Sequence, residues 1–272
     1  MSAPNELALE ASGISRQYRR RDGSIINALS NVKLSIPEGE FVCIVGPSGC
    51  GKSTLLQLCA GLDRPTSGTI RARGISIAGP GPDRGVVFQK DSVFPWMSVI
   101  DNVEYGLRCR GIGASDRRKT ALHYLARVGL AEVAHAWPRE LSGGMLKRVA
   151  IASVFANGSD ILLLDEPFGA LDYVTRHKIH DVLLELWNEV DRRKRTVLFI
   201  THDVDEALTL ADRILVMRGG RLIDDLRVES KRPRDDETLA KPVMISLKRK
   251  LLEHLGIAHT NASRDQAVES IA

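Results

Sequence analysis

The sequence predicts an α/β fold in which a mainly parallel core sheet is joined to an antiparallel β layer and an inserted helical subdomain. Short runs of Val, Ile and Leu alternate with longer segments of helical periodicity. The first third of the chain instead alternates apolar and polar residues, whereas residues 94–157 carry almost wholly helical patterns. A length of 272 residues is enough for one large domain with an insertion.

Two kinds of strand are predicted. Runs that are apolar at nearly every position are typical of parallel strands covered on both faces, and they lie at residues 42–45, 85–88, 161–164 and 197–200. Alternating patterns at residues 7–36 and 68–77 favour antiparallel strands, with turns at residues 22–23 and 37–39. A last strand is expected at residues 221–228.

Helical periodicity is found in six segments, at residues 52–62, 99–109, 117–128, 142–156, 174–190 and 203–211. We expect one domain over residues 1–230, with the helical subdomain inserted at about residues 91–158. Residues 231–272 would form a Pro- and charge-rich linker, a short helix near residues 239–255 and a polar, mobile tail from residue 260.

Composition excludes several classes of protein. A hydrophobic share of 43% and a charged share of 26% are ordinary for a soluble globular protein, and the net charge of +4 argues against a dedicated nucleic-acid binder. Cys43, Cys50, Cys59 and Cys109 have neither metal-binding nor disulfide spacing. The first residues do not resemble a signal peptide, and no apolar run approaches the roughly 18 residues of a membrane span. Any membrane role would therefore come through a partner.

A glycine-rich segment follows the first buried strand and opens the first helix, which is where a phosphate-binding loop belongs. It fits the pattern G-x-x-x-x-G-K-[ST], in which backbone N–H groups and a helix N-terminus surround phosphate oxygens. Lys52 would reach the β- and γ-phosphates, and Ser53 would ligate Mg²⁺. The alternative is a plain glycine-rich turn. The nucleotide-binding residues predicted here are Gly46, Pro47, Ser48, Gly49, Cys50, Gly51, Lys52, Ser53 and Thr54.

Two acids, Asp165 and Glu166, end the apolar run at residues 161–164. A carboxylate at the end of a buried parallel strand lies at the edge of the sheet where ligands bind. Asp165 would hold Mg²⁺ beside Ser53, and Glu166 would polarise an attacking water. The alternative is a pair of solvated acids at a strand end.

A short segment at residues 141–145 precedes these acids by one helix and contains Ser142, Gly143 and Gly144. Taken alone, it predicts a helix start with Ser142 as the N-cap. Beside a phosphate loop, the same segment favours a second set of contacts to a phosphate that the loop already binds.

With these segments identified, the chain resembles the ATPase subunit of an ABC transporter over residues 8–228. Five motifs occur in that family's order and approximate spacing: the phosphate loop, residues 141–145, residues 165–167, residues 169–172 and residues 201–203. The resemblance implies the P-loop NTPase fold of ABC ATPases, ATP and Mg²⁺ as cofactors, and ATP hydrolysis coupled to transport.

The resemblance also implies roles for single residues. Tyr18 would stack on adenine, the alternative being a strand-surface residue. Gln89 would sense Mg²⁺ and the γ-phosphate, so that Ser53, Gln89 and Asp165 form the metal set. His202 would contact the γ-phosphate. The catalytic residues are then Glu166, His202, Lys52 and Gln89.

Further implied roles concern a second copy of the chain. Ser142, Gly143 and Gly144 match the signature that binds ATP held by the partner subunit, and Asp172 matches a loop that crosses between two subunits. The expected assembly is therefore a homodimer with two ATP molecules between its subunits.

Other segments resemble the nitrate, sulfonate and taurine importers, in particular residues 94–99, 167–172 and 232–235. An exposed Phe94-Pro95-Trp96 would suit a groove that receives a permease helix, although an apolar turn that caps a helix explains it as well. Leu146-Lys147 departs from the family, because a more polar pair is usual there.

This resemblance implies integral-membrane permease subunits, an indirect periplasmic solute-binding protein, no nucleic acid, and a peripheral location on the cytoplasmic face of the inner membrane. Three alternatives remain open. The machine could be an ABC exporter or lipid transporter, the chain could be a soluble ABC ATPase that acts on ribosomes or DNA, or it could be a simple P-loop kinase.

Overall fold

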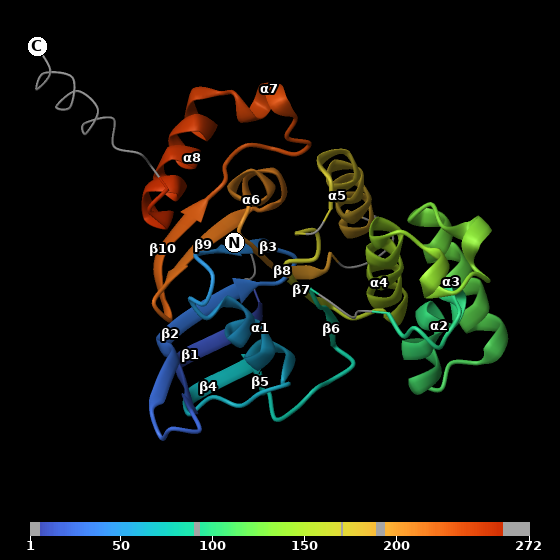
Figure 1. Cartoon of the computed structure of the whole chain (residues 1–272), viewed down its shortest axis with the longest axis horizontal. Helices are drawn as coiled ribbons and strands as arrows, with labels where there is room; N and C mark the ends of the chain where they lie inside the picture. Colours follow the sequence, from blue (N-terminus) through green and yellow to red (C-terminus); the bar gives the residue numbers. More distant parts are fainter. Residues whose placement is uncertain (1–5, 90–92, 170, 189–193, 258–272) are drawn as a thin grey trace, which may run out of the picture.

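A computed structural model describes residues 6–89, 93–169, 171–188 and 194–257 of the chain. Within them, a six-stranded sheet has the order β10-β9-β3-β8-β7-β6 (Figure 1). Its strands are parallel except for the edge pair β9–β10. The strands span β3 (Phe41–Val45), β6 (Arg84–Val87), β7 (Ile161–Asp165), β8 (Thr196–Thr201), β9 (Arg213–Arg218) and β10 (Arg221–Arg227).

A four-stranded antiparallel sheet of order β2-β1-β4-β5 lies beside it. Helix α1 (Lys52–Ala60) packs between the two sheets, because its apolar side chains share one buried cluster with residues of both. The four strands are β1 (Leu7–Arg19), β2 (Ile25–Pro37), β4 (Ser67–Ala72) and β5 (Ile75–Ser76). This sheet brings residues 26–28 of β2 up to the phosphate loop.

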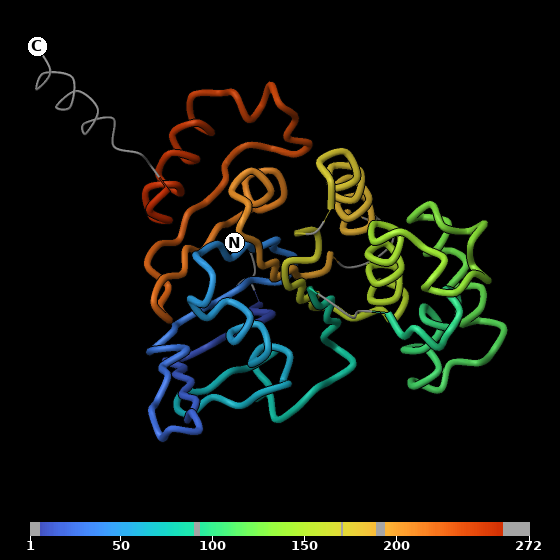
Figure 2. The backbone as a smooth tube through the Cα atoms, viewed as in Figure 1, coloured from blue at the N-terminus to red at the C-terminus, as the bar shows by residue number. Residues whose placement is uncertain are grey.

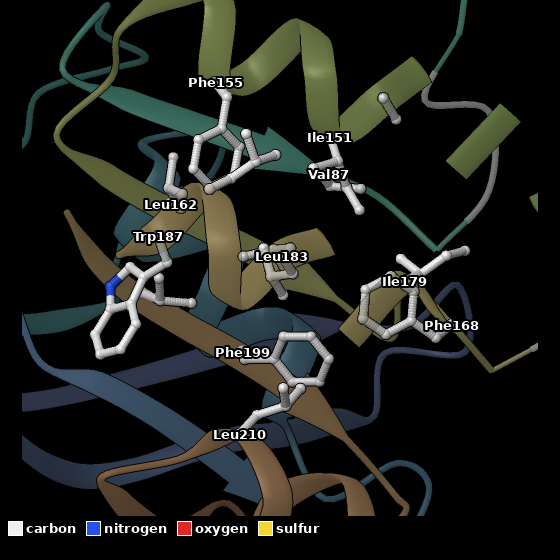
Figure 3. Packing of buried hydrophobic residues seen from close by; sticks show 14 of the residues in the cluster. Val87, Ile151, Phe155, Leu162, Phe168, Ile179, Leu183, Trp187, Phe199 and Leu210 are labelled. Atoms are coloured by element: carbon white, nitrogen blue, oxygen red, sulfur yellow. The ribbon is translucent and has the colours of Figure 1, made fainter. Parts of the chain in front are cut away.

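Three helices form a lobe to one side of the sheets, inserted between β6 and β7 (Figure 2). They are α2 (Val99–Cys109), α3 (Ala114–Arg127) and α4 (Gly143–Asn157). Short 3₁₀ turns at Ala131–Val133 and Pro138–Glu140 lead from α3 to α4. Apolar side chains such as Phe155 of α4 and Leu162 of β7 belong to one buried cluster, so the lobe is continuous with the core (Figure 3).

The remaining helices cover the face of the parallel sheet opposite α1. They are α5 (Tyr173–Trp187), α6 (Val204–Leu210), α7 (Asp236–Leu239) and α8 (Pro242–Leu255). Leu183 of α5 lies close to Phe199 of β8 (Figure 3), and both side chains are fully buried. Trp187 meets Phe41 edge-on, with ring centroids 5.4 Å apart. Burial of each such side chain stabilises the fold by roughly 1.5–3 kcal/mol.

The predicted fold class is confirmed, and the predicted helices begin and end within a few residues of the observed ones. One strand, β9, was not predicted, although its apolar run at residues 214–217 is as long as the runs that predicted β3 and β7. The helix expected near residues 239–255 is α8, and the short helix α7 before it was not predicted. Pro242 opens α8 at a position where its missing N–H is tolerated, and it cannot continue a helix from α7.

The segment predicted as a linker, residues 231–237, is packed against the domain, since the side chain of Arg234 is only 5% exposed. The mobile tail expected from residue 260 lies outside the described residues. In the described part of the chain, no helix combines the length and the apolar character that a bilayer crossing requires.

Candidate functional site

The phosphate loop connects β3 to α1, as predicted, and its backbone conformation requires glycine at two points. Gly51 has φ of 108°, and a Cβ there would lie 2.5 Å from the carbonyl oxygen of Ala28. A Cβ on Gly46 would lie 2.3 Å from the carbonyl oxygen of Met217. Neighbouring strands therefore approach the loop too closely for a side chain at Gly46 or Gly51.

Lys52 lies inside this loop with only 5% of its surface exposed. Its ammonium donates hydrogen bonds to the carbonyl oxygens of Gly46 (2.8 Å) and Pro47 (3.2 Å) and lies 4.0 Å from the Glu166 carboxylate. A buried positive charge inside a glycine-rich loop at a helix N-terminus is an arrangement that binds phosphate.

Asp165 ends β7 and accepts a hydrogen bond from the Ser53 hydroxyl at 3.1 Å. Burial raises the pKa of Asp165, and the neighbouring charge of Glu166 adds to the rise, whereas Ser53 and Lys52 oppose it. A half-buried carboxylate next to a hydroxyl fits a site for a divalent cation.

Three motifs meet at Glu166. Its carboxylate accepts a hydrogen bond from the Gln89 amide at 3.2 Å and lies 3.1 Å from Nδ1 of His202. Lys52 approaches the other carboxylate oxygen. Gln89, Glu166, Lys52 and His202 thus come together at the carboxyl edge of the sheet, where the sequence predicted them.

The cavity formed there measures about 330 Å³. The phosphate loop, Gln89 and Glu166 line it, and residues 26–28 of β2 close one side. No group of three or more His, Cys, Asp or Glu side chains in the described residues could hold a metal ion. Mg²⁺ usually binds through one or two protein oxygens together with substrate phosphates. The Ser53 hydroxyl and the Asp165 carboxylate therefore fit Mg²⁺ carried by a nucleotide, and the loop fits its phosphates.

Cys50 is not among the described residues that line this cavity. Its side chain is buried, and burial raises the pKa of its thiol, so that it stays neutral at physiological pH. The residue contributes to the loop through its backbone.

Tyr18 lies on β1 and is half-buried. Its hydroxyl donates a hydrogen bond to Asp63 at 2.7 Å, and the Arg16 guanidinium lies 4.5 Å from the centre of its ring. One ring face is therefore covered by Arg16. Tyr18 is not among the described residues that line the cavity, although its ladder partner Ile26 is. The stacking role of Tyr18 stays a prediction.

Ser142, Gly143 and Gly144 begin α4 at a different place. Ser142 is the N-cap, and its hydroxyl accepts a hydrogen bond from the Met145 N–H at 3.3 Å. None of the three is among the described residues that line the cavity at the phosphate loop. Ser142 and Gly143 are exposed. The helix-cap interpretation of this segment is therefore correct, and the cap leaves the segment available to a partner.

Asp172 caps α5, where it accepts a hydrogen bond from the Thr175 N–H at 3.0 Å. This bond lowers the pKa of the exposed Asp172 carboxyl, which keeps it negatively charged. Like Ser142, it faces solvent rather than the cavity.

A second, larger cavity of about 770 Å³ lies between the Gln89 loop and the start of α4. Val93, Phe94, Pro95 and Trp96 line it on one side, and Trp96 is 67% exposed. Gln89 lines this groove and also bonds Glu166, so the groove and the phosphate cavity share a residue.

Sequence reasoning missed several residues around the site. The Lys147 ammonium donates to the carbonyl oxygens of Phe88 and Gln89, and the departure from the family pattern at Leu146-Lys147 was a signal for it. Asp63 had no such signal, because its bond to Tyr18 joins residues 45 positions apart.

Arg176 was missed for the same reason. Its guanidinium donates to the Asp203 carboxylate at 2.7 Å and to the Leu171 carbonyl at 3.1 Å. His180, one turn after His177 on α5, is buried and bonds Glu206 at 2.8 Å.

Comparison with known proteins agrees with this geometry. The family model described as ABC transporter matches residues 29–169. A nitrate import ATP-binding protein of Synechocystis sp. is 49% identical over 232 residues, which cover 85% of each chain. A taurine import ATP-binding protein of Rhizobium johnstonii is 49% identical over 208 residues, covering 76% of this chain and 78% of that protein.

Solved structures are similar as well. A dimeric post-hydrolysis state of an ATP-binding cassette bound to ADP and Pi superposes with a TM-score of 0.73 and 36% identity, covering 82% of this chain and all of that one. The phosphate loop, the acids at residues 165–166 and His202 lie together at the cavity, whereas Ser142 and Asp172 lie exposed elsewhere on the surface. The chain therefore belongs to the ABC transporter family, and its activity is the hydrolysis of ATP coupled to transport across a membrane.

Proposed function

We propose that this chain is the ATP-hydrolysing subunit of an importer for a small anion such as nitrate, taurine or an alkanesulfonate. The observation that carries the catalytic part is the convergence of Lys52, Gln89 and His202 on the Glu166 carboxylate. The similarity to nitrate and taurine import proteins supports the transport part.

The residues around the phosphate cavity act on ATP as follows. Ser53 and Asp165 would hold Mg²⁺, which would neutralise phosphate charge when bound. Lys52 and the loop N–H groups bind the β- and γ-phosphates. Glu166 orients the attacking water and accepts its proton, and His202 stabilises the charge that develops on the γ-phosphate. Gln89 joins this site to the groove on the other side of its loop.

The functional assembly would contain two copies of the chain. The exposed Ser142, Gly143 and Asp172 would face the nucleotide held by the second copy, so that ATP draws the two subunits together. Only the closed dimer makes these contacts, and this difference in affinity lets ATP shift the equilibrium toward it. The dimeric cassettes among the similar structures support this arrangement.

The groove beside Gln89 would receive a cytoplasmic helix of the permease. Its exposed Phe94 and Trp96 rings, whose centroids are 5.5 Å apart, offer an apolar surface of the kind that buries the apolar face of a partner helix. Bound there, the chain would lie on the cytoplasmic face of the inner membrane. A periplasmic binding protein would act through the permease.

The transported solute is tested by uptake in a strain that lacks this gene. Labelled nitrate, taurine and an alkanesulfonate are supplied, and the gene is returned as wild type or as Glu166→Gln. We expect uptake of one of the three to be lost and to be restored by the wild type alone. Normal uptake of all three would contradict the importer. Accumulation of a substance inside the cell would then indicate an exporter, and failure to co-purify with any permease would indicate a soluble ATPase.

A further inference from the structure

Helix α6 begins two residues after His202, so its position determines where the histidine lies. Asp203 caps the helix by accepting hydrogen bonds from the N–H groups of Asp205 (2.9 Å) and Glu206 (3.2 Å). The helix has only seven residues, and a helix of this length is not stable by itself in water. The packing around α6 must therefore hold it, and with it the backbone of His202.

Arg234 holds the carboxyl end of α6. Its guanidinium donates to the carbonyl oxygens of Leu208 (2.8 Å), Thr209 (3.3 Å) and Ala211 (2.6 Å), which are acceptors left unpaired where a helix ends. The same side chain also donates to the Ser230 carbonyl at 2.7 Å. Burial and the nearby Arg232 lower the pKa of Arg234 to about 10, which leaves the guanidinium charged at neutral pH.

Arg232 also contacts the C-terminal end of α6. It donates to the remaining carbonyl, that of Leu210, at 2.6 Å and forms an ion pair with Asp212 at 2.7 Å. Its guanidinium lies 4.7 Å from the ring of Trp187, the last residue of α5. Positive charge at a helix C-terminus is favourable, because the carbonyl groups there carry partial negative charge.

The first turn of α6 is held from the same segment of chain. Lys248 of α8 forms an ion pair with Asp205 at 2.6 Å. Met244 and Leu251 of α8 are buried in the cluster that includes Leu208 of α6. Helix α6 thus lies between the parallel sheet on one side and α8 on the other (Figure 1).

We propose that residues 230–255 form a clamp that sets the position of α6 and thereby of His202, with Arg234 as the principal positioning residue. The clamp accounts for the Arg232-Pro233-Arg234 segment, which the site itself does not use. This inference goes beyond the ATPase and importer functions, and it rests on the proposed role of His202.

The first test separates catalysis from binding. In Arg234→Met, which removes every donor, we expect kcat for ATP hydrolysis to fall about 10- to 100-fold, since small displacements of reacting groups have effects of this size. ATP binding to the phosphate loop should stay within about twofold of wild type. Arg234→Lys keeps the charge with fewer donors and should fall between the two. Arg249→Met, on the exposed side of α8, is the matched control and should leave both quantities unchanged.

If Arg234→Met does not fold, Arg234→Lys carries the same test. A reduced kcat at unchanged ATP affinity supports the clamp. A wild-type kcat in a folded Arg234 variant overturns it, and so does a loss of ATP affinity equal to the loss in kcat.

The second test observes the histidine directly. The ring signal of His202 is followed by NMR in the full chain with ¹³C-labelled histidine, and it is assigned by its absence from His202→Ala. We expect it to shift or broaden in both Arg234 variants but not in Arg249→Met. An unchanged signal overturns the clamp. If His202→Ala itself hydrolyses ATP at the wild-type rate, the role of His202 fails instead, and the NMR result still decides whether Arg234 positions it.

Discussion

Glu166 adopts φ of 42°, a left-handed backbone conformation that is unusual for a residue other than glycine. Its N–H donates to the Ile200 carbonyl at 3.0 Å, which ties the strained residue to β8. Strain of this kind costs about 1–3 kcal/mol and persists where surrounding contacts enforce it. Here it directs the carboxylate toward Lys52, Gln89 and His202.

Replacing Glu166 by Gln should stop hydrolysis and leave ATP binding intact. The amide is close in shape but cannot accept the proton of the attacking water, so we expect kcat to fall by about 10²–10⁴-fold. Size-exclusion chromatography with ATP should then detect a trapped dimer. Hydrolysis at the wild-type rate would show that another group acts as the base.

Replacing Asp165 by Asn should stabilise the nucleotide-free protein and abolish its Mg²⁺-dependent activity. Burial raises the pKa of Asp165 in the fold, so its ionised form costs stability at every pH above that raised pKa. The cost disappears once the pH falls below the ordinary Asp value of about 3.9.

The increase in Tm of Asp165→Asn should therefore be largest near pH 7 and shrink as the pH falls toward 4. Differential scanning calorimetry without nucleotide measures it, with Asp181→Asn on the exposed face of α5 as the control. A lower Tm for Asp165→Asn at pH 7 would mean that the carboxylate stabilises the fold.

At the scale of elements, the site is made by connections at strand ends. The loop after β3 supplies the phosphate cradle, the end of β7 supplies both acids, and the loop after β8 supplies His202. These strands are parallel neighbours, so their carboxyl ends meet at one edge. The connection from β3 to α1 is the most constrained, because β2 and β9 both touch its backbone.

Gly51→Ala tests that constraint. The new methyl group would meet the Ala28 carbonyl at 2.5 Å at a φ that alanine rarely adopts. We expect unfolding free energy to fall by about 1–3 kcal/mol and ATP affinity to fall with it. Gly113→Ala, at the N-cap of α3 with open space around it, should stay within about 0.5 kcal/mol of wild type in chemical denaturation. Equal effects of the two substitutions would contradict the steric argument.

At the scale of the whole molecule, the phosphate cavity and the Ser142 segment belong to different parts of the surface. Within the described residues of one chain, the cavity has no contribution from the signature. If two copies complete each other, two inactive variants should restore activity when mixed. This follows because a phosphate loop and a signature on different subunits form one site.

Ser142→Arg blocks the signature and keeps the phosphate loop, whereas Lys52→Ala does the opposite. We expect each variant alone to lack ATP hydrolysis, and Ser142→Arg alone to bind ATP normally. Subunits mixed in equal amounts should regain activity, because the mixed dimer has one intact site. A mixture as inactive as its components would argue against a site shared between subunits.

The class of the fold and the main nucleotide-binding residues could be predicted from the amino-acid sequence. The phosphate loop and the acids at residues 165–166 were identifiable because each depends on local features: residue type, spacing and a strand end. Patterns of apolar residues predicted the buried strands and the helices for the same reason. The histidine at position 202 was identified through the resemblance to the family's motifs.

The contacts between these residues depend on how the chain folds in three dimensions. Ser53 and Asp165 are 112 positions apart, and Glu166 and His202 are 36 apart, so the packing of the sheet sets their contacts. It also buried Arg234 in a segment that resembles a linker and bound the hydroxyl of Tyr18 to Asp63. The physical reason is that a side chain's burial and partners depend on segments distant in sequence, which local patterns do not record.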